Sequence, residues 1–489
     1  MYFNSLQYLL FTAVVVSTYW MLVELRMLRL FVLLCASWVF YMSWSPLFIL
    51  LIIGSTFLDY AAGLAIYRAE RPGIRKLFLM VSMVGNLGLL GIFKYYDFFA
   101  GAIADSFRLL AAALLEWPGI AWSPLTTAAD QIPFLNLVLP VGISFYTFQT
   151  MSYTIDIYRR QLEPTRSFLQ FATFVAFFPQ LVAGPIVRAS EFLPQLRHRP
   201  RIDMEKVGHG LFLILAGLVK KVVFADYLAI NLVDRVFDRP DAFTSVEVLV
   251  ALYGYTVQIY CDFSGYSDVA IGTGLLMGLR LPDNFDRPYQ STNPAEFWRR
   301  WHMTLSSWLR DYLYFPLGGS RRGPIRSYVN LFLTLFLIGL WHGAAWTFVL
   351  YGTIHATAMV FHRFWVRLRK QDVDRVDSQA IFVFKVALMF HFTVLSRILF
   401  RAKDLDNASA VADQLLLGTT SVAQVAPTVW LAIGLAMAIH WTPKRWVVQV
   451  KEAFTALPAL VQGVIMAAVG ALLVEVATSD VVPYIYFQF

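Results

Sequence analysis

Residues 328–354 read YVNLFLTLFLIGLWHGAAWTFVLYGTI and contain no Lys, Arg, Asp or Glu. A helix that spans a membrane needs about 20 consecutive, mainly apolar residues. The wider stretch 327–362 is long enough for a tight pair of short spans. This part of the chain therefore predicts helices embedded in a membrane.

The composition extends this prediction to the whole chain. Of its 489 residues, 58% are hydrophobic and 15% are charged, whereas soluble domains average about 25% charged residues. We expect an all-α, polytopic integral membrane protein with about a dozen helical crossings in a single domain, 1–489. The other segments that qualify or nearly qualify as spans are 7–24, 28–43, 46–66, 77–93, 134–156, 207–224, 245–262, 381–400, 426–442 and 457–478.

Clusters of Lys and Arg predict the orientation, because basic loops stay on the cytoplasmic side. Both termini then lie outside, provided that 168–187, which is interrupted by Pro179 and Pro185, is a re-entrant segment. Since the net charge of +8 follows this topology, nucleic-acid binding explains it poorly. The loops expected in the cytoplasm are Arg26/Arg29, 68–76, 159–166, 188–206, 280–326, 363–375 and 444–451, and those expected outside are 94–132, 225–245 and 479–489.

The segment near 294–314 has the pattern of an amphipathic helix. Asn293 can cap it, Pro294 suits the first helical position, and Glu296 can complete a capping box. A stripe of apolar residues at three- and four-residue spacing predicts an interfacial helix, with its apolar face towards the bilayer and its cationic face towards the cytosol. His302 lies at the margin of this stripe, which consists of Trp298, Trp301, Leu305, Trp308 and Tyr312.

Cations on and after this helix are candidates for binding an anionic substrate. Arg299 and Arg300 lie on its polar face, and Arg321 and Arg322 follow a turn that contains two glycines. Backbone donors and cations together suit a phosphate. A solvated cytoplasmic loop is the simpler interpretation of any single arginine.

His342 is the ionisable side chain that stands out in the charge-free run. Desolvation should hold a buried imidazole there neutral, which is the state that a general base needs. The alternative is a histidine bonded to the carbonyl of a neighbouring helix. The neighbours Trp341 and Trp346 are candidate pore-lining residues, and we expect no metal site, because no histidine pair with an acidic partner has ligand spacing.

A second polar block lies in the apolar segment around 258–268, where Asp262 and Ser264 are candidate funnel residues. Ionisable groups inside a membrane often mark ion or substrate pathways. Asp262, His342 and Glu475 could therefore form the proton relay of a transporter. Many transporters consist of two related halves, and we find no such internal similarity.

Several blocks give the chain a resemblance to the membrane-bound O-acyltransferase (MBOAT) family, in particular to the bacterial branch that includes alginate and peptidoglycan O-acetyltransferase membrane components. The similarity covers nearly the whole chain in order. The two blocks at 297–319 and 341–346 are together the most specific. The blocks are PVGISFYTFQ (140–149), DFSGYSD (262–268), PDNFDRPY (282–289), FWRRWHMTLSSWLRDYLYFPLGG (297–319) and WHGAAW (341–346).

The resemblance implies a ring of tilted helices around a central funnel in the bacterial inner membrane. It implies that His342 is the catalytic histidine and that His302 is a second histidine needed for activity. It also implies acetyl-CoA as the donor, with no permanently bound cofactor, and a separate extracytoplasmic partner of SGNH type that completes transfer to a polysaccharide. A D-alanyl transfer protein for teichoic acids, a proton-coupled transporter and a scaffold for polysaccharide secretion are the alternatives.

The C-terminal residues VPYIYFQF (482–489) resemble an aromatic motif of this branch and of a small teichoic-acid D-alanylation protein. The resemblance implies that Tyr486 carries the acyl group as an ester. An aromatic anchor at the membrane surface is the simpler physical interpretation.

Overall fold

The computed structural model describes residues 1–114, 123–369, 378–476 and 483–485 of the chain. These residues form helices joined by turns, with an isolated β-bridge between Phe285 and Trp301. In chain order the α-helices are α1 (Leu6–Met21), α2 (Arg26–Met42), α3 (Ile49–Arg68), α4 (Pro72–Leu90), α5 (Tyr96–Leu114), α6 (Ser123–Asp130), α7 (Ile143–Tyr158), α8 (Phe168–Ala176), α9 (Phe178–Leu181), α10 (Ala189–Arg197), α11 (Met204–Val219), α12 (Asp234–Asp238), α13 (Ser245–Leu276), α14 (Pro294–Arg300), α15 (Met303–Leu309), α16 (Pro324–His342), α17 (Trp346–Leu368), α18 (Gln379–Arg401), α19 (Leu405–Leu416), α20 (Pro427–Trp441), α21 (Lys444–Thr455) and α22 (Ala459–Val476).

Short 3₁₀ and π segments interrupt or extend these helices. Of the described π segments, three follow α4, α11 and α15 without a break and the fourth leads directly into α12, so that each forms a local widening of a longer helix. The 3₁₀ segments are η1 (Pro46–Phe48), η5 (Pro240–Ala242) and η6 (Pro288–Gln290), and the π segments are η2 (Gly91–Tyr95), η3 (Lys220–Asp226), η4 (Ala229–Val233) and η7 (Arg310–Tyr314).

The predicted class, an all-α integral membrane protein, is confirmed. The described residues include helices that are long and apolar enough to cross a membrane. Within the described ranges, 5 stretches meet both conditions, and two shorter helices, α1 and α20, are also apolar. The total number of crossings stays a prediction. The 5 stretches are Pro46–Arg68, Pro72–Leu114, Pro324–His342, Gln379–Arg401 and Ala459–Val476.

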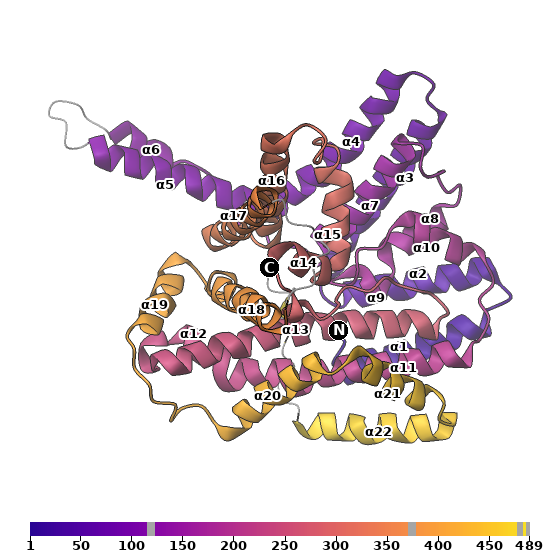
Figure 1. Ribbon diagram of the computed structural model, residues 1–489. Helices are drawn as coiled ribbons and strands as arrows, with labels where there is room; N and C mark the ends of the chain where they lie inside the picture. Colours follow the sequence, from indigo (N-terminus) through magenta and orange to yellow (C-terminus); the bar gives the residue numbers. More distant parts are fainter. Residues whose placement is uncertain (115–122, 370–377, 477–482, 486–489) are drawn as a thin grey trace.

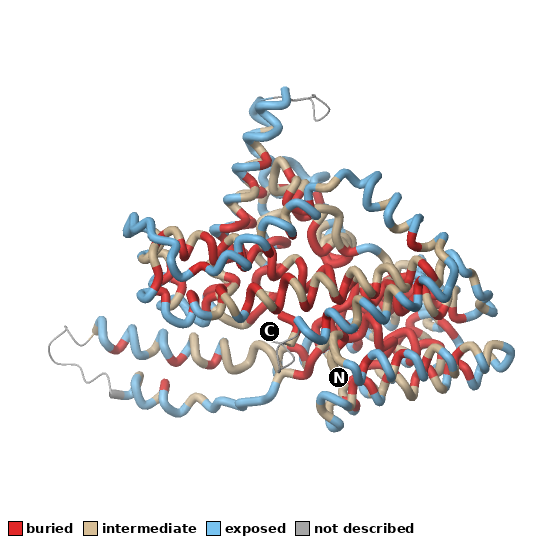
Figure 2. The backbone as a smooth tube through the Cα atoms, turned by 90° about the horizontal axis from the view of Figure 1, so that it is seen from below, coloured by how far each residue is buried: buried red, intermediate tan, exposed pale blue. Residues whose placement is uncertain are grey.

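The helix α13 forms the centre of the structure. It is 32 residues long and most of its side chains are buried, whereas residues of α5, α6, α20 and α22 are largely exposed (Figures 1 and 2). It packs closely on α11, because a Cβ on Gly265 would come within 2.7 Å of the Gly217 carbonyl oxygen. Small residues of this kind allow helix backbones to approach in membranes.

The segment expected outside the membrane, 94–132, projects from the rest of the molecule. Its helices α5 and α6 pack against each other and extend away from the other helices in both views (Figures 1 and 2). Arg108 of α5 forms an ion pair with Asp130 of α6 at 3.0 Å. The base of this arm is fixed by Asp97, whose carboxylate accepts hydrogen bonds from the backbone N–H groups of Leu135 and Asn136.

The segment predicted to be re-entrant, 168–187, is broken as its prolines suggest. The helix α8 ends at Ala176, α9 begins at Phe178, and Pro179 occupies the first turn of α9. Residues 170–187 are all buried. The path of this segment relative to the membrane stays a prediction.

The prediction of a continuous interfacial helix over 294–314 is wrong. The chain forms α14, breaks at Trp301 and His302, and resumes as α15 and η7. His302 has a positive φ of 45°, and the Asn284 carbonyl oxygen accepts a hydrogen bond from the Met303 N–H. The loop around Asn284 and Phe285 therefore supplies hydrogen-bond partners for the backbone at the break, which an unbroken helix would satisfy with its own carbonyl and N–H groups.

The apolar stripe of this segment faces the protein core, and His302 is wholly buried. Periodicity alone does not distinguish a face towards lipid from one towards protein, because an apolar helix face has the same pattern whichever of the two covers it. The stripe residues Trp298, Trp301, Leu305, Trp308 and Tyr312 are all buried.

The stretch 328–354 forms the predicted pair of helices, α16 and α17, joined by residues 343–345. The two helices cross at Gly339 and Gly352. A Cβ on Gly339 would lie 2.5 Å from both the Gly352 Cα and the Phe348 carbonyl oxygen. Backbone atoms cannot move aside as a flexible side chain can, so the crossing needs glycine at this position.

We predict that Gly339→Ala lowers the free energy of unfolding by about 1–3 kcal/mol, the usual cost of overpacking. Gly434→Ala is the matched control, because a Cβ there would meet nothing within 4 Å. The measurement is thermal unfolding of the purified protein in detergent. Equal melting temperatures for the two variants would contradict the crossing seen here.

Candidate active site

His342 is the last residue of α16, and its ring is bonded to its own helix. Nδ1 lies 2.7 Å from the carbonyl oxygen of Ile338, one turn earlier. Because a carbonyl oxygen only accepts hydrogen bonds, Nδ1 carries the proton. In the neutral ring, Nε2 then holds the lone pair, as a general base requires.

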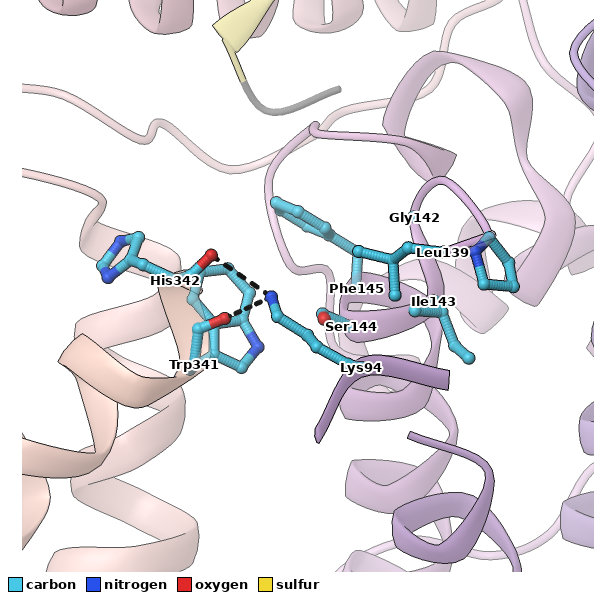
Figure 3. Close-up of a pocket in the computed structure, with 9 residues that line it drawn as sticks. Lys94, Leu139, Gly142, Ile143, Ser144, Phe145, Trp341 and His342 are labelled. Atoms are coloured by element: carbon cyan, nitrogen blue, oxygen red, sulfur yellow. Dashed lines mark hydrogen bonds between the residues drawn. The ribbon is translucent and has the colours of Figure 1, made fainter. Parts of the chain in front are cut away.

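Lys94 binds the end of the same helix. Its ammonium donates hydrogen bonds to the carbonyl oxygens of Trp341, at 2.6 Å, and His342, at 3.3 Å (Figure 3). The last carbonyls of a helix have no partner within the helix, and a cation near them is stabilising. Figure 3 shows the imidazole of His342 pointing away from the ammonium of Lys94. Lys94 thus fixes the backbone that carries the histidine.

The structure brings His302 and His342 to the same tryptophan. The ring of Trp341 lies 5.8 Å from that of His302 and 5.2 Å from that of His342, measured between centroids. On its other side His302 contacts Phe263 of α13, at 4.8 Å. His302 lies at the break between α14 and α15, where its own positive φ changes the direction of the chain.

Arg397 of α18 adds a second cation that the sequence pattern did not reveal. It is fully buried, with its guanidinium 4.6 Å from the ring centroid of Trp301 and 5.3 Å from that of Phe400. Phe400 in turn contacts the ring of His342, at 5.2 Å. The imidazole therefore lies in an aromatic environment with a cation on each side, one from η2 and one from α18.

Two cavities reach this part of the molecule. A small one, of about 20 Å³, is lined by His342 and Trp341 and by Lys94 and residues 139–140 and 142–145. A large one, of about 580 Å³, runs along α16 as far as Ile338, whose carbonyl oxygen is bonded to His342. The cationic or imidazole side chains that line the large cavity are Arg299, Arg310, His362, Arg363 and Lys385.

Of the four arginines predicted to bind an anion, Arg299 lines the large cavity. Arg300 instead forms an ion pair with Glu296 at 2.7 Å. Arg321 and Arg322 are exposed and line neither cavity. The sequence pattern missed Arg310, Arg363 and Lys385, because they come from three different elements that only the fold brings together.

The two tryptophans of the WHGAAW block have different surroundings. Trp341 is buried between the histidines and lines the small cavity. Trp346 is 52% exposed and packs on Phe98 of α5 at 5.5 Å. It lines neither of these two cavities, and its place in a pore stays a prediction.

Asp262 and Ser264 are buried on α13 but line neither cavity. The carboxylate of Asp262 accepts hydrogen bonds from Lys221 Nζ, at 2.7 Å, and from the Ile485 N–H, at 2.8 Å. Glu475 is exposed on α22. The structure thus pairs Asp262 with a lysine and the C-terminal segment, and it does not assemble the proton relay considered for a transporter.

Tyr486, the predicted acyl carrier, lies outside the described residues. The three residues before it, 483–485, are described, and Tyr484 and Ile485 are buried. Tyr484 lies 5.1 Å from Tyr266 of α13. The C-terminal segment is therefore in contact with the central helix at this point.

Comparison with known proteins gives the family. Residues 130–401 match the model of MBOAT, the membrane-bound O-acyltransferase family. Probable alginate O-acetylase AlgI of Pseudomonas aeruginosa is 39% identical over 383 residues, which cover 78% of this chain and 68% of that protein. Peptidoglycan O-acetyltransferase of Helicobacter pylori is 35% identical over 405 residues, covering 78% and 72%.

A more distant relative is teichoic acid D-alanyltransferase of Bacillus subtilis, which is 28% identical over 298 residues, covering 58% of this chain and 73% of that protein. The family match includes both His302 and His342. The buried histidines, the two cavities and these similarities agree, and the chain belongs to the membrane-bound O-acyltransferase family.

Proposed function

We propose that the protein takes an acetyl group from cytoplasmic acetyl-CoA and passes it across the bacterial inner membrane for O-acetylation of an extracytoplasmic polysaccharide. The position of His342 carries this proposal. The large cavity ends one helical turn from it, and the small cavity touches it from the side of Lys94. An acyl group attacked there would cross the membrane while the charged CoA stayed behind.

The large cavity has the charge expected of a CoA site. Phosphates are best held by charge-assisted hydrogen bonds from arginine and lysine, and Arg299, Arg363 and Lys385 line this cavity. Its apolar wall includes Leu331 and Leu335 of α16, which suit an uncharged pantetheine arm. In this arrangement the thioester would approach His342 along α16.

The chemical step follows from the neutral imidazole. Nε2 of His342 accepts the proton of an acceptor hydroxyl while that oxygen bonds to the thioester carbonyl carbon. The C–S bond breaks, and the imidazolium returns its proton to the leaving thiolate to give free CoA. His302, across Trp341, would orient the donor or assist the thiolate. The acceptor hydroxyl would belong to Tyr486 or to a separate extracytoplasmic partner of SGNH type.

The names of the relatives support acetyl as the transferred group. One is named for O-acetylation of alginate and another for that of peptidoglycan, at 39% and 35% identity, and a third for transfer of D-alanine, at 28%. Acetyl transfer is therefore preferred. Both termini would lie outside, as the distribution of basic loops predicts.

We expect His342→Ala to lower the rate of acetyl transfer roughly 10²–10⁴-fold, the usual contribution of a positioned base. The assay uses the full chain in proteoliposomes with labelled acetyl-CoA. His391→Ala is the matched control, since Nδ1 of His391 makes the same bond to a carbonyl one turn earlier, at 2.8 Å, yet the residue lines neither cavity. Undiminished transfer by folded His342→Ala would remove this residue from the mechanism.

The same assay tests the donor site. Arg299→Ala and Arg363→Ala should each raise the KM for acetyl-CoA by roughly tenfold, because each removes a charge-assisted contact. Arg321→Ala is the control and should leave the KM unchanged, since Arg321 is exposed and lies outside the cavity. Turnover of a carrier-protein thioester in place of acetyl-CoA would instead favour D-alanyl transfer.

Lys94 has a different expected effect. Lys94→Met removes the cation from the end of α16, so the backbone of His342 loses its support. We expect kcat to fall roughly 10–100-fold, as small misplacements of reacting groups do, with little change in the KM for the donor. Exposed Lys76→Met serves as the control. A rise in KM with unchanged kcat would show that Lys94 binds the donor instead.

A further inference from the structure

A buried ion cluster joins η3 to α13 and lines neither of the two cavities described above. Lys221 of η3 has its ammonium 2.7 Å from Asp226 Oδ1 and 2.7 Å from Asp262 Oδ1. The side chains of Lys221 and Asp262 are 1% and 3% exposed. Burying charges is costly even when they are paired. A cluster of this kind is therefore a candidate for a binding function.

Three consecutive residues of the C-terminal segment contact the cluster. The Pro483 carbonyl oxygen accepts a hydrogen bond from Lys221 Nζ, at 3.2 Å. The ring of Tyr484 lies over the same ammonium, at 4.3 Å from its centroid. The Ile485 N–H donates to Asp262 Oδ2, at 2.8 Å. One lysine and one aspartate thus contact a carbonyl, an aromatic face and an amide, which is how a binding site recognises an extended peptide.

The N-terminal residues border the same site. The Phe3 ring stacks on Tyr266 at 4.3 Å and contacts Tyr484 at 6.3 Å. The Asn4 side-chain amide donates to Asp226 Oδ2, at 3.4 Å. Tyr484 is consequently 1% exposed, and the peptide is held between the N-terminal residues and α13.

The site and a candidate catalytic residue contact neighbouring positions of α13. Asp262 holds the Ile485 amide, and the next residue, Phe263, contacts the His302 ring at 4.8 Å. Tyr486 follows Ile485 in the sequence. The C-terminal segment therefore binds α13 one residue along the chain from the contact that α13 makes with His302.

We propose that Lys221 and Asp262 form a binding site for the C-terminal segment of the chain, 483–485, and that they are positioning residues for Tyr486. The binding itself does not depend on the function proposed above. Only the role given to Tyr486 rests on that function. A backbone amide that enters a buried site needs an acceptor, and the ionised carboxylate of Asp262 supplies it.

The chain contains a matched control for this cluster. Lys220, the neighbour of Lys221 in η3, pairs with Asp268 of α13 at 2.6 Å. This is a second lysine–aspartate pair between the same two elements, and neither residue has a described contact with 483–485. Its side chains are 26% and 20% exposed, so Asp268→Asn controls for the loss of a carboxylate on α13, and only the Asp262 pair should affect the C-terminal segment.

The test is carboxypeptidase digestion of the full chain in lipid nanodiscs, with release of Ile485 followed by mass spectrometry. Digestion follows the fraction of molecules in which the segment is open. We expect Asp262→Asn and Tyr484→Ala to release Ile485 roughly tenfold faster or more than wild type, because the first weakens the charge-assisted hydrogen bond to the Ile485 N–H and the second removes the aromatic ring over the Lys221 ammonium. Asp268→Asn and Tyr484→Phe, which keeps the ring, should behave as wild type.

Tyr484→Ala changes only the segment, so it tests binding even if Asp262→Asn does not fold. Equal release of Ile485 from wild type and Tyr484→Ala would overturn the binding site. Acetyl transfer is measured on the same samples. Unchanged transfer by a variant whose segment is released would overturn the positioning role. Loss of acetyl transfer in Tyr486→Phe, with Ile485 still protected from digestion, would support both the binding site and the acyl-carrier role of Tyr486. Full acetyl transfer in that variant would contradict the acyl-carrier role. The binding site would then be judged by the digestion result alone.

Discussion

The candidate active site depends on how the end of α16 is stabilised inside a membrane protein. The last carbonyls of a helix have no partner in the helix, and lipid supplies none. Here the Lys94 ammonium binds the carbonyl oxygens of Trp341 and His342, and the His342 ring binds that of Ile338. These contacts fix the backbone, the ring and the tautomer together. The close crossing of α16 and α17 at Gly339 holds the helix in place.

The two cavities near this helix end differ in the residues that line them. The large cavity is lined by cations that come from α14, η7, α17 and α18, as a charged donor requires. The small cavity, beside Lys94, has room for about one water molecule. His342 lines the small cavity, and Ile338, one helical turn earlier, lines the large one. In the proposed mechanism the donor would approach the imidazole along this turn of α16.

The central helix α13 connects this site to both ends of the chain. Phe263 supports His302, Asp262 binds the C-terminal segment, and Tyr266 stacks with Phe3. Residues more than 200 positions apart in the sequence thus contact one helix. The buried ammonium of Lys221 lies between Asp226 and Asp262. It also contacts the Pro483 carbonyl oxygen and the Tyr484 ring. Such a cluster is expensive as a purely structural element, since apolar residues could fill the same space.

The sequence by itself determined the membrane class, the α16–α17 pair and the two candidate histidines, because apolar length, missing charge and family motifs are local patterns. It did not determine that the helix over 294–314 breaks at His302, since an apolar stripe does not reveal whether lipid or protein covers it. Nor did it indicate Lys94, Arg397 or Lys221, which lie far from His342 and Asp262 in the chain. Only the tertiary structure places these cations, because charge pairing in a folded protein depends on distance in space and not on spacing in sequence.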